Sequence, residues 1–235
     1  INPATASTIF QIRCRSENMA NLVAPPPSSR YDDRSSGALV ETAFTVWCTG
    51  LPSSGKSQLA EALAPAIVAR GFQTEVINSG KMRKTPLGAS LGFSKDDRDT
   101  NIHRHAFAAN LLVKNGVVAI VSAVSPYAET RRAVREELGE YAEVYVSTPK
   151  AACIDRDKDG AWAKALRGDI RGFTGVDDPY EAPTAPDVTV DLSQLSIEAA
   201  VYRVLAALEG LGWIPPVPKA SSEDAGLLDP ALRSS

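Results

Sequence analysis

The sequence predicts an α/β protein with an open, mostly parallel sheet and helices on both of its faces. Between residues 44 and 213, short apolar runs alternate with longer stretches of helical periodicity, which is the order of a repeated strand–helix unit. The run at 117–121 is apolar and mostly β-branched, as expected of a parallel strand that is covered on both faces. Parallel strands joined through helices make right-handed crossovers.

The first half of this region begins with a strand candidate at 44–48, which reads Phe-Thr-Val-Trp-Cys. Residues 58–70 are rich in Ala and Leu and predict a helix. Residues 74–77 predict the second strand. A long helix is expected over 96–115, because Gly116 follows it where helices commonly take a left-handed glycine.

The second half continues from the apolar strand with a helix of mixed charge at 127–138 and a strand at 143–146. A short β-branched run at 188–190 predicts the last strand. The final helix is expected over 196–211. Its first residue, Ser196, has a hydroxyl that can accept a hydrogen bond from a free N–H of the first turn.

The length of 235 residues allows one large domain or two small ones. We expect one domain at 44–213, flanked by a flexible or peripheral extension at 1–43 and a tail at 214–235, because both ends lack periodicity and contain proline-rich stretches. Within the domain, segment 158–185 is rich in charged residues and glycine and poor in apolar periodicity. Such a long irregular segment is usually functional or disordered.

Composition narrows the class of protein. A net charge of −3 argues against a protein that coats nucleic acid or an anionic membrane, since both favour a basic surface. No apolar run approaches the ~20 residues of a membrane-spanning helix. Cys14, Cys48 and Cys153 are widely spaced and form no CxxC pair. A reducing, cytoplasmic location is therefore expected, rather than a disulfide scaffold or a zinc site.

The strongest motif fits G-x-x-x-x-G-K-[ST] and lies between the first predicted strand and helix, where a phosphate-binding loop belongs. It consists of Gly50, Leu51, Pro52, Ser53, Ser54, Gly55, Lys56 and Ser57. The glycines let successive N–H groups point into one cavity, and the helix adds its positive N-terminal end. Lys56 can reach the β- and γ-phosphates, and the Ser57 hydroxyl can ligate Mg²⁺. The motif predicts a P-loop NTPase-type fold that binds ATP or GTP with Mg²⁺.

The phosphate loop leaves the reaction open. The NKxD base reader of switch GTPases is absent from the sequence. The apolar strand at 117–121 runs into Ser122 rather than into the acid expected of a motor or AAA ATPase. The expectation that remains is a small kinase, which positions an acceptor beside the γ-phosphate.

Four segments resemble the adenylylsulfate (APS) kinases. They are 44–57, 91–104 (Leu-Gly-Phe-Ser-Lys-Asp-Asp-Arg-Asp-Thr-Asn-Ile-His-Arg), 124–127 (Val-Ser-Pro-Tyr) and 168–183, which begins Gly-Asp-Ile-Arg-Gly-Phe-Thr-Gly. Enzymes of this family move the γ-phosphate of ATP to the 3′-hydroxyl of adenosine 5′-phosphosulfate, giving PAPS. The resemblance covers about 44–213 and implies this activity, ATP and Mg²⁺ as cofactors, and a homodimer.

The residue types at these segments suit an anionic second nucleotide. Arg98 and Asn101 are three residues apart and share a helix face, and guanidiniums such as Arg83 suit a phosphosulfate. The alternative is that these arginines lie on the surface and form ion pairs along the helix. The resemblance implies that Phe93 and Phe173 clasp the adenine of APS between their rings. The alternative is that both are side chains of the hydrophobic core. The full implied acceptor set is Arg83, Phe93, Arg98, Asn101, Val124, Ser125, Pro126, Tyr127, Arg171, Gly172 and Phe173.

The resemblance also implies that segment 158–185 is a lid over both nucleotides. Arg156 is then expected to face ATP and Arg171 the phosphates. Lys164 is a weaker candidate. A solvated charge is the alternative for each of the three.

The chain departs from the family in one stretch. Where APS kinases carry Asp-Gly-Asp-Asn-x-Arg, it reads Asn78-Ser79-Gly80-Lys81-Met82-Arg83. The missing second acid would orient the 3′-hydroxyl and accept its proton, and loss of a general base typically costs ~10²–10⁴-fold in rate. The residues expected at the reacting centre are Lys56, Ser57, Asn78, Gly80 and Lys81.

Three interpretations stay open. The chain is an APS kinase, slow or with a base recruited from elsewhere, such as the nearby Asp96, Asp97 or Asp99. It phosphorylates a different small-molecule hydroxyl. Or it binds nucleotides and acts as a weakly active or inactive regulatory homologue.

Overall fold

The computed structural model describes residues 42–86, 88 and 90–216. Most of the extension predicted at 1–43 and of the tail predicted at 214–235 lies outside the described residues. At the two boundaries, Ala43 and Ile214 are buried in the same hydrophobic cluster. The packed core therefore reaches one residue beyond each predicted end.

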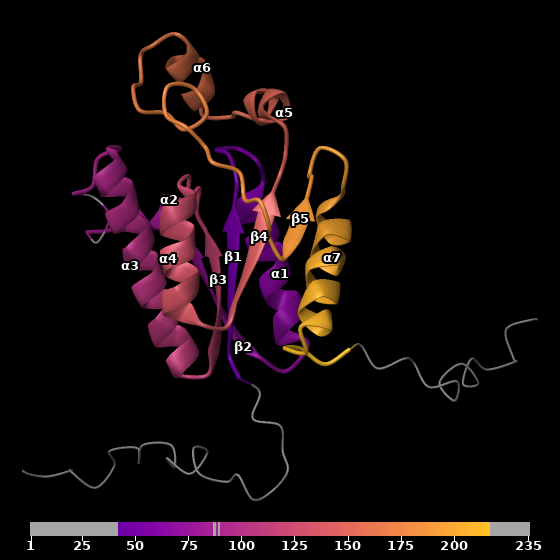
Figure 1. Cartoon of the computed structure of the whole chain (residues 1–235). Helices are drawn as coiled ribbons and strands as arrows, with labels where there is room; N and C mark the ends of the chain where they lie inside the picture. The colour runs from indigo at the N-terminus through magenta and orange to yellow at the C-terminus, as the bar shows by residue number, and fades with distance from the viewer. Residues whose placement is uncertain (1–41, 87, 89, 217–235) are drawn as a thin grey trace, which may run out of the picture. The chain divides into compact units, whose positions relative to one another are not determined.

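A five-stranded sheet forms the centre of the fold (Figure 1). Its strand order is β2-β3-β1-β4-β5, and every pairing is parallel. The strands are β1 (Thr45–Thr49), β2 (Gln73–Asn78), β3 (Val117–Ser122), β4 (Tyr141–Val146) and β5 (Val188–Val190). The predicted fold class is confirmed, and β1 lies in the middle of the sheet, where open α/β folds bind ligands beyond the strand ends.

Helices cover both faces of the sheet. Two helices pack on one face and two on the other, and Figure 1 shows three short ones near the carboxyl ends of the strands. They are α1 (Lys56–Val68) and α7 (Ile197–Gly210) on one face, α3 (Lys95–Lys114) and α4 (Ala128–Leu138) on the other, and the short α2 (Ser79–Met82), α5 (Lys150–Asp155) and α6 (Ala161–Leu166).

Side-chain alternation along the strands builds a separate core on each face. Val46 and Cys48 of β1 belong to the cluster under α1 and α7. Trp47, between them, belongs to the cluster under α3 and α4. Successive side chains of a strand point to opposite faces, so an apolar run such as β1 can fill both layers.

The helix ends follow the signals in the sequence. Ser196 caps α7 by accepting a hydrogen bond from the Ala199 N–H at 3.2 Å. Gly116 has φ +76°, the left-handed conformation expected after α3. The predicted elements lie within about two residues of the observed ones.

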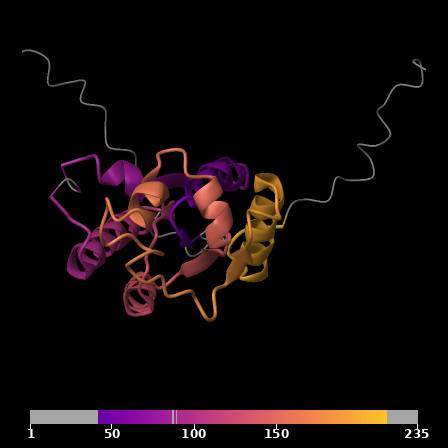
Figure 2. The same ribbon diagram turned by 90° about the horizontal axis from the view of Figure 1, so that it is seen from above.

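Three short helices were not predicted. α2, α5 and α6 have four to six residues each, too few to show a helical period in the sequence. The expectation of an irregular segment at 158–185 was wrong at α6, whose Trp162 is fully buried. Figure 2 looks down on this segment, which crosses over the carboxyl ends of the strands. None of the helices in the described part of the chain is both long and apolar enough to span a membrane.

Candidate active site

The phosphate loop leaves the end of β1 in a conformation that needs its glycines. Gly50 has φ +153° and Gly55 has φ +98°. A Cβ on Gly50 would lie 2.5 Å from the backbone oxygen of Val146, which cannot move aside. Ser53 is left-handed as well, at φ +60°. These φ values set the curl that turns backbone N–H groups inward.

Lys56 folds back over this loop. Its Nζ donates to the Leu51 carbonyl oxygen at 2.6 Å and to Ser54 Oγ at 3.2 Å. Burial lowers the pKa of Lys56 to about 8. The ammonium is thus partly desolvated, which strengthens its attraction for a phosphate.

Two hydroxyls meet beside the loop. Ser57 Oγ lies 3.2 Å from Ser122 Oγ, at the end of β3. The described residues contain no group of three or more His, Cys, Asp or Glu side chains that could hold a metal. Mg²⁺ commonly takes one or two protein ligands and completes its shell with phosphates and water, so this donor set fits a metal that arrives with the nucleotide. The sequence did not predict Ser122 as a site residue, because it is a lone serine that follows the apolar run at 117–121.

A cleft of about 390 Å³ adjoins the loop at Pro52. Nine of the eleven residues predicted for the acceptor line it: Arg83, Phe93, Arg98, Asn101, Val124, Ser125, Pro126, Gly172 and Phe173. Tyr127 and Arg171 do not. Six further residues line the cleft that were not predicted to do so: Pro52, Ser79, Ile102, Ala161, Ile170 and Thr174.

Two guanidinium groups converge around the Phe93 ring. The Cζ atoms of Arg83 and Arg98 lie 4.7 and 5.7 Å from its centroid. Burial, followed by the charge of Arg98, lowers the pKa of Arg83. Phe93 is 58% exposed, so one large ring and two cations face the cleft. This combination suits an aromatic, anionic ligand.

Segment 158–185, the predicted lid, contacts Arg98 directly. The Arg98 guanidinium donates to the Gly172 carbonyl oxygen, and its Nε lies 3.5 Å from Asp178 Oδ2. Asp178 also accepts a hydrogen bond from Tyr127 at 2.9 Å. Burial and this bond raise the pKa of Tyr127 to about 12. Tyr127 therefore contacts segment 158–185 from outside the cleft lining.

The other lid candidates lie at the edges of the site. Phe173 packs edge-on against Trp162, with ring centroids 5.0 Å apart. Arg156 donates to the Leu192 carbonyl oxygen at 2.6 Å, and a Leu192 methyl group lies beside Gly55 of the phosphate loop. Arg171 and Lys164 are exposed.

Two residues of the stretch at 78–83 line the cleft, Arg83 and Ser79. The Ser79 hydroxyl accepts a hydrogen bond from Asn101 Nδ2 at 3.2 Å. Asn78 instead caps α2, with Oδ1 accepting from the Lys81 N–H at 3.1 Å. Lys81 is exposed and pairs with Glu61 at 3.0 Å. Gly80 is not among the lining residues.

A profile of the family described as adenylylsulphate kinase matches residues 42–191, which is more than half of the chain. The chain belongs to the APS kinase family.

Individual relatives agree with this assignment. The adenylyl-sulfate kinase of Picosynechococcus sp. is 44% identical over 172 residues, covering 73% of this chain and 97% of that protein. The adenylyl-sulfate kinase of Deinococcus deserti is 48% identical over 166 residues, covering 71% and 91%. The structure of a Mycobacterium tuberculosis APS kinase in complex with AMPPNP and APS matches with a TM-score of 0.68 and 38% identity, covering 72% of this chain and 98% of that one. The protein is accordingly a kinase-type phosphotransferase with a nucleotide-binding P-loop fold.

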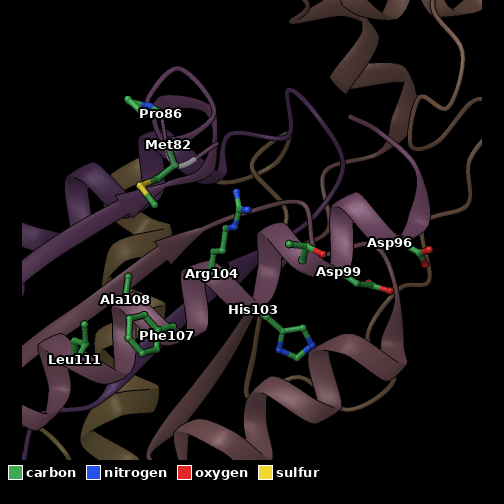
Figure 3. Close-up of a pocket in the computed structure, with 10 residues that line it drawn as sticks. Met82, Pro86, Asp96, Asp99, His103, Arg104, Phe107, Ala108 and Leu111 are labelled. Atoms are coloured by element: carbon green, nitrogen blue, oxygen red, sulfur yellow. The ribbon is translucent and has the colours of Figure 1, made fainter. Parts of the chain in front are cut away.

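This APS kinase family member has a second, larger hollow on the outward side of α3. Figure 3 shows its residues, which include Met82, His103, Phe107 and Leu111. Its volume is about 950 Å³, but it contains no residue of the phosphate loop and none of those that line the cleft. The smaller cleft, by contrast, is lined by Pro52 of the phosphate loop and by the paired guanidiniums of Arg83 and Arg98.

Proposed function

We propose that the protein transfers the γ-phosphate of ATP to the 3′-hydroxyl of APS, giving PAPS. One observation carries the proposal: a single cleft, adjoining the phosphate loop at Pro52, gathers two guanidiniums, a buried amide and two aromatic rings. APS has matching features, namely an adenine to stack and a phosphosulfate to neutralise. Stacking of a base on an aromatic side chain contributes ~1–3 kcal/mol.

In this proposal the phosphate loop holds ATP and the cleft holds APS. Lys56 neutralises charge on the β- and γ-phosphates, and Ser57 is the protein ligand of Mg²⁺. The metal, when bound, neutralises charge that develops on the phosphate oxygens. Arg83 and Arg98 bind the anionic end of APS, while Phe93 and Phe173 hold its adenine. Phosphoryl transfer depends mainly on such positioning and charge neutralisation.

The site lacks an evident base to accept the proton of the 3′-hydroxyl. None of the described residues that line the cleft carries a carboxylate. Ser79 faces the cleft from the stretch where the family has its acids, and it can hydrogen-bond the hydroxyl but is a poor base at neutral pH. We therefore expect transfer that is slower than in acid-bearing relatives by up to ~10²–10⁴-fold.

The decisive experiment measures ADP release with Mg·ATP, with and without APS, and identifies PAPS as the product. APS-dependent ADP release by the unmodified protein supports the proposal. APS binding without turnover, with activity gained in Gly80→Asp, supports the regulatory homologue instead. Neither turnover nor APS binding points to a different acceptor hydroxyl. The absence of an acid from stretch 78–83 is the observation that favours these two alternatives.

Three further expectations belong to the proposal. Arg156 contributes to the ATP side and Arg171 to the phosphate side once both nucleotides are bound. The protein works in the cytoplasm. It forms a homodimer, which light scattering on the purified full chain at micromolar concentration would test.

A further inference from the structure

Arg131 of α4 is buried, and its guanidinium makes three polar contacts beside a cation–π contact with the Tyr180 ring, whose centroid lies 6.0 Å from its Cζ. One terminal nitrogen donates to the Ser125 carbonyl oxygen at 2.7 Å, and the other donates to the Glu181 carbonyl oxygen at 2.7 Å. Its Nε lies 3.0 Å from a carboxylate oxygen of Glu143 on β4. Arg131 is 4% exposed and Glu143 7%. The planar fork of one guanidinium thus joins two chain segments that are distant in sequence.

The first of these segments is the cleft wall at 124–127. Ser125 is buried and has φ +46°, which is uncommon for a residue with a side chain. Such a conformation persists only where its surroundings hold it. Trp47 Nε1 donates to Ser125 Oγ at 2.9 Å, and Arg131 holds the carbonyl of the same residue. Ser125 is therefore held at both its side chain and its backbone.

The second segment is the chain that returns from the lid. The Glu181 N–H donates to the Pro126 carbonyl oxygen at 2.9 Å, and its carboxylate accepts from the Ala128 N–H at 2.6 Å, at the start of α4. The preceding Tyr180 lies 3.0 Å from Thr49 Oγ1. Arg131 completes this junction through the Glu181 carbonyl.

We propose that Arg131 is a positioning residue for the acceptor nucleotide, which it aligns by fixing the cleft wall at 124–127 and the lid return at 180–181 relative to each other. This inference rests on the proposed function. The segment that Arg131 holds lines the acceptor cleft, and no hydrogen bond between Arg131 and the phosphate loop occurs among the described residues. The acceptor side should respond to its loss, and the ATP side should not.

The test uses Arg131→Lys in the full-length protein. Lysine keeps the charge opposite Glu143, which protects folding, but one ammonium cannot reproduce the fork to both carbonyls. We expect KM for APS to rise on the order of tenfold or more, with KM for ATP changed less than about twofold. The exchange rate of the Glu181 amide hydrogen should rise as well, because its bond to Pro126 loosens.

Two further variants sharpen the result. Arg132→Gln is the matched control, since this neighbouring arginine is exposed, and it should change neither KM nor amide exchange. Glu143→Gln keeps both carbonyl bonds and should raise KM for APS less than Arg131→Lys does. The opposite order would assign the effect to the ion pair and overturn the inference.

Equal rises in both KM values, or an Arg131→Lys variant with unchanged KM for APS and unchanged Glu181 exchange, would also overturn it. If the unmodified protein neither binds nor turns over APS, the proposed function fails. Glu181 amide exchange then decides the positioning role by itself: faster exchange in Arg131→Lys, with Arg132→Gln unchanged, retains that role, and unchanged exchange removes it.

Discussion

Asn101 donates its side-chain amide to the hydroxyl of Ser79 across 3.2 Å, and both residues line the cleft. This bond joins α3, which supplies Arg98, to the stretch where the family has its acids. Asn101 is 4% exposed, and the Ser79 side of the bond lies at the cleft surface. Of the positions where the family has its acids and their glycine, only Ser79 lines the cleft, with a hydroxyl rather than a carboxylate.

A carboxylate at position 80 should raise activity. A Cβ on Gly80 would meet only the Asn78 side-chain oxygen among its described neighbours, at 3.2 Å, and Gly80 has no positive φ, so a side chain fits after a small shift. We expect Gly80→Asp to increase APS-dependent ADP release on the order of 10²-fold. Gly80→Asn is the matched control, because it has the same shape without a basic carboxylate. Equal gains in both variants would contradict a proton-accepting role.

The cleft rings should determine affinity for APS. We expect Phe93→Leu to raise KM for APS about tenfold or more, because a stacked base contributes ~1–3 kcal/mol, with little change in KM for ATP. Phe107→Leu is the control, since this ring is 63% exposed and lies in the second hollow. Steady-state kinetics with each substrate varied in turn separates the two effects. A change in KM for ATP alone would place Phe93 on the other nucleotide.

The burial of the Lys56 ammonium should lower the stability of the folded protein in a way that depends on pH. Its pKa is lowered by burial from 10.5 to about 8, so between these pH values the unfolded chain binds more protons, and stability rises with pH. Lys56→Met lacks this penalty. The stability of Lys56→Met relative to the unmodified protein should therefore fall as pH rises from 8 to 10.5 and stay constant below pH 8. Urea denaturation at several pH values checks this, and a pH-independent difference contradicts it.

The same substitution should abolish most phosphoryl transfer, because in the proposed site Lys56 neutralises charge on the β- and γ-phosphates. Lys114→Met, at the exposed end of α3, is the control and should retain activity. Comparable ADP release by Lys56→Met and the unmodified protein would contradict a role for Lys56 in phosphoryl transfer.

Gly50→Ala should disrupt the phosphate loop. The new Cβ would lie 2.5 Å from the Val146 carbonyl oxygen, and backbone on both sides would have to move. We expect loss of ATP binding, measured by calorimetry, together with lower stability. Gly210→Ala offers the contrast, because nothing lies within 4 Å of its added Cβ and the residue is helical. That change should stabilise the protein by up to ~0.5–1 kcal/mol and leave ATP binding unchanged.

Long elements and special loops were readable from the sequence because their causes are local. Strand β3 is an unbroken apolar run, α7 has a serine at its N-cap, and the glycines of the phosphate loop adopt positive φ. The short helices were not readable. Trp162 of α6 is fully buried, its ring packs against Phe173, and its Nε1 donates to the Pro52 carbonyl oxygen. The contact with the phosphate loop is distant in sequence.

The sequence by itself determined the α/β class and the phosphate loop, since each depends on residue type at a fixed spacing. Its resemblance to the APS kinases indicated the family and most of the predicted residues that line the cleft. The tertiary structure decided which neighbours face that cleft. Within one turn of helix, Ser79 lines the cleft, Asn78 caps α2, and Lys81 forms an ion pair with Glu61. It also brought Arg131 to Ser125 and Glu181. Side-chain direction in a short helix and contacts across 50 residues depend on how the layers pack, which no local pattern records.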